Sequence, residues 1–151
     1  MSRTAPHPTR VTTAVAAVAA CAAALALTLA ATGPAAATVR SDPNGRHTAA
    51  EVHRFLTGFY GHHGPTRHQR DHQVSAHLKD RAAHTDGYDL LLCAQNAPRS
   101  ITVGKVTTAQ SAGVGWATVT THWDGGTRRS FTAYVGLDSH PITLQDVDCA
   151  P

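Results

Sequence analysis

Residues 113–137, GVGWATVTTHWDGGTRRSFTAYVGL, decide the fold class of this 151-residue chain. The first part is rich in β-branched and aromatic residues, and Asp124-Gly125-Gly126 has the composition of a hairpin turn. On the returning part, every second residue is apolar: Phe131, Ala133, Val135 and Leu137. Thr132 and Tyr134 then lie on the other face of the strand. The stretch predicts an antiparallel β-hairpin with one apolar face.

Two further strands are predicted on either side of this hairpin. Ile101 and Val103 begin a strand after Ser100, and residues 142–147 form a closing strand that ends at Cys149. The meander therefore has four strands.

The residues before the meander predict helices. Thr48 and Glu51 have the spacing of a capping box, and apolar residues then recur at helical spacing: Val52, Phe55, Leu56 and Phe59. Residues 71–83 predict a mostly solvated helix, and residues 88–95 predict a short buried helix or turn. Helices followed by an antiparallel meander predict an α+β domain, with the helices on one face of the sheet.

The first 37 residues predict export. Arg3 and Arg10 precede an uncharged apolar run over residues 11–31, and Ala35-Ala36-Ala37 fits a signal-peptidase site. We expect a signal peptide at 1–37, a flexible lead-in at 38–47 and one domain at 48–151, secreted after cleavage. A lipoprotein anchored through Cys21 and an uncleaved membrane anchor are the alternatives.

Charge and cysteine content limit the function classes. Without Arg3 and Arg10, 11 Lys and Arg residues face 10 Asp and Glu residues, so the charge gives no reason to expect nucleic-acid binding. The two remaining cysteines, Cys93 and Cys149, are expected to form a disulfide in an exported domain, with buried free thiols as the alternative.

Several segments together resemble a known family. They are a helix with Phe55 and Phe59-Tyr60, a helix ending near Leu78, the segment from Tyr88-Asp89 to Cys93-Ala94-Gln95-Asn96, and the closing Asp146-Val147-Asp148-Cys149. Over residues 49–149 the chain is similar to a family of small exported bacterial domains of unknown function with a nuclear transport factor 2-like cone fold. The resemblance implies a curved sheet wrapped around the first helix, with a cavity between them. The superfamily includes SnoaL-like cyclases, ketosteroid isomerases and non-enzymatic binding modules, and its members commonly pair through the sheet, which implies a possible homodimer.

Asp89 is the candidate for a catalytic residue. As a partly buried carboxylate it would be the general base of isomerase- or cyclase-like proton transfer, with Tyr134 or Tyr60 as donor. An aspartate directly before an apolar run is more commonly a cap whose carboxylate accepts the amide of Leu91 or Leu92. We therefore predict no catalytic residue.

Five residues are candidates for lining a ligand pocket: Tyr60, Trp116, Tyr134, Gln95 and Asn96. The aromatic residues are equally ordinary in an α+β core, and the two amides are equally suited to bonding the backbone near Pro98.

Histidines are the candidates for metal binding. His68 and His72 stand four residues apart and would need a third ligand such as Asp71 or His63 to hold Zn²⁺ or Cu²⁺. Histidines on a polar helix are usually solvated, and the chain has no catalytic-triad order, P-loop or Gly-rich phosphate motif, so we predict no metal and no cofactor. The expected function is non-catalytic binding of a small apolar or amphipathic ligand or of a protein partner. An enzyme using Asp89 and a metal-sequestering protein are the alternatives.

Overall fold

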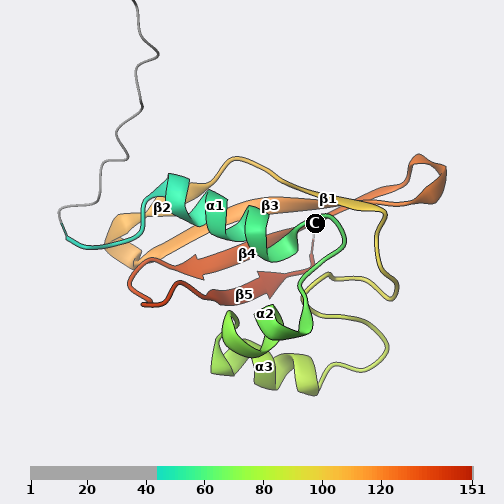
Figure 1. Cartoon of the computed structure of the whole chain (residues 1–151), viewed down its shortest axis with the longest axis horizontal. Coiled ribbons are helices and arrows are strands. Elements are labelled where there is room, and N and C mark those ends of the chain that lie inside the picture. The colour runs from blue at the N-terminus through green and yellow to red at the C-terminus, as the bar shows by residue number, and fades with distance from the viewer. Residues whose placement is uncertain (1–43, 151) are drawn as a thin grey trace, which may run out of the picture. The chain divides into compact units, whose positions relative to one another are not determined.

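A computed structural model describes residues 44–150 of the chain (Figure 1). These residues form an α+β domain, as predicted. Its helices are α1 (Ala49–Tyr60), α2 (Arg67–His72) and α3 (Ala76–Ala83). Its strands are β1 (Ser100–Val103), β2 (Thr107–Ala109), β3 (Val114–His122), β4 (Arg128–Gly136) and β5 (Leu144–Asp148).

The five strands form one antiparallel sheet in the order β1-β3-β4-β5, with β2 also paired to β3. Its centre is the predicted hairpin, in which β3 and β4 pair from Val114–Gly136 to His122–Arg128. The predicted alternation on the returning strand is confirmed: Phe131, Ala133, Val135 and Leu137 are all at most 2% exposed. We call the face that carries them the inner face. The short strand β2 is a fifth strand that the sequence did not predict, because its three residues carry no apolar alternation.

Helix α1 begins at the predicted capping box. The Thr48 hydroxyl accepts the Glu51 amide at 3.3 Å, and the Glu51 carboxylate accepts the Thr48 amide at 2.7 Å. Val52, Leu56, Phe59 and Tyr60 of this helix are buried in the same core as the inner face of the sheet. The rings of Tyr60 and Phe131 lie 5.6 Å apart, centroid to centroid. Figure 1 shows α1 running along the sheet.

The prediction of a single helix at residues 71–83 is wrong, since the structure has two helices, α2 and α3, separated by residues 73–75. Residues 73–75 form hydrogen bonds with β5, along the edge of that strand that does not pair with β4. The Leu144 amide donates to the Gln73 carbonyl at 2.8 Å, and the Ser75 amide donates to the Leu144 carbonyl at 2.9 Å. Val74 is 4% exposed there, so tertiary pairing and burial outweigh helix continuity. Figure 1 shows both helices beside β5.

Residues 88–95, predicted as a helix or a turn, form a turn. The amides of Asp89 and Ala94 each bond the other residue's carbonyl, which closes the segment like a small hairpin. Leu90, Leu91 and Leu92 at its tip are each at most 5% exposed. The closing strand begins at Leu144, two residues later than predicted.

The predicted signal peptide, its cleavage site and Cys21 lie outside the described residues. Within residues 44–150, none of the helices has the length and apolar character that a membrane span requires.

Candidate functional site

A pocket of about 540 Å³ opens at the hairpin end of the inner face. The turn at residues 88–96 forms one wall, and the ends of β3 and β4 with their connection form the other. Its lining residues are Tyr88, Cys93, Ala94, Gln95, Asn96, Trp123, Thr127, Arg129 and Cys149. The volume is in the range of pockets that bind small molecules.

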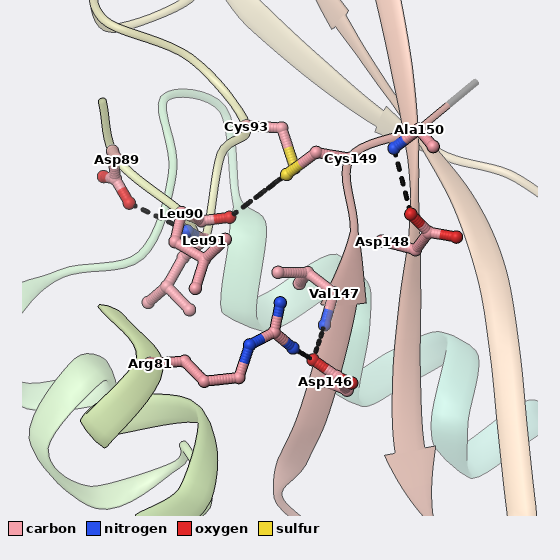
Figure 2. Close-up of a disulfide and its surroundings, with 10 residues drawn as sticks. All are labelled: Arg81, Asp89, Leu90, Leu91, Cys93, Asp146, Val147, Asp148, Cys149 and Ala150. Atoms are coloured by element: carbon pink, nitrogen blue, oxygen red, sulfur yellow. Dashed lines mark hydrogen bonds and ion pairs between the residues drawn. A yellow bond between two sulfur atoms is a disulfide. The ribbon is translucent and has the colours of Figure 1, made fainter. Parts of the chain in front are cut away.

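The predicted disulfide between Cys93 and Cys149 is present and belongs to the wall of this pocket. The two Cα atoms are 5.4 Å apart, and Figure 2 shows the bond connecting the turn to the chain that leaves β5. The sulfur atoms of Cys93 and Cys149 lie 3.5 and 3.9 Å from the Leu90 carbonyl oxygen. The cross-link therefore fixes one wall of the pocket to the sheet.

Asp89 anchors the same turn to α2. Its carboxylate accepts hydrogen bonds from both terminal nitrogens of the Arg70 guanidinium, at 3.1 and 2.6 Å, and from the Leu91 amide, at 3.0 Å. Asp89 is not among the pocket's lining residues. A carboxylate held by a guanidinium and a backbone amide, away from the pocket, does not have the geometry of a general base.

Hydrogen bonds around Thr121 position the opposite wall. This side chain is 1% exposed, and its hydroxyl accepts the indole N–H of Trp123 at 3.1 Å and donates to the Arg129 carbonyl at 3.1 Å. The Trp123 amide also donates to the Thr127 carbonyl at 2.9 Å. The indole ring is therefore held in place by hydrogen bonds within the protein.

Several side chains at the pocket have polar groups without partners. Gln95, Asn96 and Arg129 make no side-chain hydrogen bond or ion pair with any residue of the described part of the chain. Tyr88 is 41% exposed, the only large apolar side chain so exposed in residues 44–150. Open polar groups beside accessible rings are what a ligand site requires.

The structure brings only two of the five predicted pocket residues, Gln95 and Asn96, to this pocket. Tyr60 is fully buried in the core, and its hydroxyl has no hydrogen-bond partner in residues 44–150. Burial, followed by the nearby negative charge of Asp89, raises the pKa of Tyr60 well above its ordinary value. Trp116 and Tyr134 are paired across β3 and β4, on the face opposite the core.

The two candidate metal ligands lie together without a third. The rings of His68 and His72 stack 4.2 Å apart, and Nδ1 of His72 lies 2.9 Å from the His68 carbonyl oxygen. Across residues 44–150, no group of three His, Cys, Asp or Glu side chains is arranged to hold a metal ion. Neither Asp71 nor His63 therefore completes the site in this arrangement.

Five lining residues were not predicted as site residues: Tyr88, Ala94, Trp123, Thr127 and Arg129. Strand alternation could have located two of them, because Trp123 and Arg129 continue the odd-numbered positions that face inward on β3 and β4. On β4 the apolar alternation ends before Arg129, and this change was the signal that the position lines a space instead of filling it.

Comparisons of the chain with protein-family models, with curated proteins and with solved structures found no significant match.

Proposed function

We propose that this chain is a secreted, non-catalytic domain that binds a small amphipathic molecule in the pocket beside the disulfide. The observation that carries the proposal is the lining itself: two accessible aromatic rings, Tyr88 and Trp123, face a space of about 540 Å³ together with polar groups that have no partner among the described residues. An apolar body with a polar group fits such a lining.

The walls of the pocket are fixed independently of any ligand, which supports a binding role. The turn is held by the disulfide and by the bidentate pair of Arg70 with Asp89. The opposite wall is held by the bonds of Thr121. Such preorganisation lowers the entropy lost when a ligand binds.

The proposal also includes the compartment. The charged start, apolar run and small-residue cleavage site of residues 1–37 support export, and the Cys93–Cys149 disulfide suits an oxidising environment.

We further propose that α1 and the sheet form the nuclear transport factor 2-like cone that the sequence resembles. The core shared by α1 and the inner face supports this arrangement. The enzyme alternative receives no support from Asp89, whose carboxylate is occupied by Arg70 and the Leu91 amide.

The test is binding of the neutral dye N-phenyl-1-naphthylamine to the full oxidised protein, followed by dye fluorescence. The two tryptophans supply a matched pair: Trp123→Ala is expected to abolish binding, whereas Trp116→Ala, on the opposite face, is expected to leave it unchanged. Tyr88→Ala removes an exposed ring without disturbing the core and is expected to weaken binding about threefold to tenfold. The proposal would be overturned if the wild type did not bind the dye, or if Trp123→Ala and Tyr88→Ala both bound it with the affinity of the wild type.

A further inference from the structure

Arg129 lies on the inner face at the end of β4. It pairs with the buried Thr121 of β3, in the same alternation as Phe131, whereas Arg128 pairs with His122 on the opposite face. Of these two neighbouring arginines, Arg129 lines the pocket and Arg128 does not.

The positive charge of Arg129 has no carboxylate partner within residues 44–150. No other residue lining the pocket carries a formal charge. Asp124, in the connection between β3 and β4, is paired with Arg99 at 3.0 Å. The pocket as described is therefore positively charged, and it disfavours a cationic ligand.

The chemistry of a guanidinium narrows the choice of ligand. Its N–H groups form a planar fork that matches the oxygens of a carboxylate, sulfonate or phosphate group. The amides of Gln95 and Asn96 line the same pocket and supply further donors. The rings of Tyr88 and Trp123 supply the apolar surface.

We infer that the ligand is an amphipathic anion, a molecule with an aromatic or apolar body and a single acidic group that binds Arg129. This inference rests on the proposed function and specifies the ligand class. It assigns to Arg129 the recognition of the acidic group, and to Tyr88 and Trp123 the recognition of the body.

Two dyes of nearly the same shape test the inference. 8-Anilinonaphthalene-1-sulfonate is N-phenyl-1-naphthylamine with one added sulfonate, so the ratio of their dissociation constants isolates the effect of the charge. We expect the full oxidised protein to bind the sulfonate dye about tenfold more tightly than the neutral dye. Since the attraction is electrostatic at an exposed group, this preference should decrease as salt is added.

The neighbouring arginines provide the matched variants. Arg129→Gln is expected to make the dissociation constants of the two dyes about equal. Arg128→Gln removes the same charge from the opposite face and is expected to keep the full preference. Both residues are exposed, so neither change is expected to unfold the domain.

The possible outcomes separate the inference from the proposed function. A tenfold preference that is lost only in Arg129→Gln supports the inference. Equal binding of the two dyes by the wild type, a preference that survives Arg129→Gln, or a preference lost equally in Arg128→Gln overturns the inference but not the proposed function. Failure of the wild type to bind either dye overturns the proposed function as well.

Discussion

The two ends of the inner face differ in what they contain, although one alternation of residues runs through both. At the Gly115 end the space is filled: a Cβ on Gly115 would come within 3.1 Å of Leu137 and 3.4 Å of Val52. At the hairpin end, the corresponding positions hold Trp123 and Arg129, and a pocket remains. The sheet is continuous, so the two ends differ in the side chains that its strands carry and in what covers them: α1 at the core end and the turn at residues 88–96 at the pocket end.

This difference also determines how each end is held together. The core end is stabilised by apolar burial of the helix α1 against the sheet, which needs no directional bonds. The pocket end has less to bury, and it depends on a disulfide, an ion pair and the hydrogen bonds of Thr121. Changes at the two ends should therefore separate stability from binding.

The largest effect is expected from removal of the disulfide. Replacing both Cys93 and Cys149 by Ala should lower the free energy of unfolding by about 4 kcal/mol, because the cross-link restricts a long loop of the unfolded chain. It should also weaken dye binding under conditions in which the variant remains folded, because one wall of the pocket is released. Urea unfolding and dye titration measure the two effects.

Leu56→Ala is the matched control at the core end. Leu56 is 0% exposed, so its truncation should destabilise the domain by about 2–5 kcal/mol without touching the pocket. We expect its folded fraction to bind dye as the wild type does. Wild-type binding by the variant without the disulfide would show that the wall does not depend on the cross-link.

An intermediate effect is expected from Thr121→Val. Valine keeps the shape of the side chain but leaves the indole N–H of Trp123 and the Arg129 carbonyl without their hydrogen bonds. The free energy of unfolding should therefore decrease by about 1–2 kcal/mol. Because the ring is no longer held, dye affinity should decrease about threefold or more. Thr118→Val, an exposed position on the opposite face, is the control and should change stability by less than about 0.5 kcal/mol. Equal dye affinity in both variants would contradict a positioning role for Thr121.

Local patterns in the sequence predicted the core end well and the pocket end poorly. The capping box at Thr48 and the alternation from Phe131 to Leu137 depend on neighbouring residues, so they were visible in the sequence. Trp116 and Tyr134 were predicted to line a pocket because they are aromatic, but the register of β3 and β4 places them on the other face.

Contacts between distant segments could not be predicted in the same way. The pairing of residues 73–75 with β5 divides a helix that its own sequence would continue. The pocket likewise joins a turn at residues 88–96 to the end of a hairpin that follows much later in the chain. Of this arrangement, only the disulfide to Cys149 and the place of Gln95 and Asn96 at a pocket were predicted. The turn residues carry no periodic signal, unlike Trp123 and Arg129, which continue the alternation of the strands.

The smallest effect is expected from Glu51→Gln, at the start of the helix that fills the core end. Gln69 forms a capping box with Thr66 in this same protein, so a glutamine in place of Glu51 should keep the bonds to Thr48 and lose only the charge. The charge near a helix N-terminus contributes about 0.5 kcal/mol, and dye binding should not change.

The pH dependence of this difference in the free energy of unfolding shows whether the Glu51 carboxylate charge causes it. Bonds from the backbone and hydroxyl of Thr48 lower the pKa of Glu51 from its ordinary value of 4.5, so the folded state binds the proton less readily than the unfolded state. The contribution is fully present above the unfolded pKa and is lost as the pH falls through the lower folded pKa. Other titrating groups are common to both proteins and cancel in the difference. We expect urea unfolding to give the wild type the higher free energy of unfolding at pH 7, and to give the two proteins equal values below about pH 4.5. A difference in free energy that stays constant through this range would mean that the carboxylate charge does not stabilise α1.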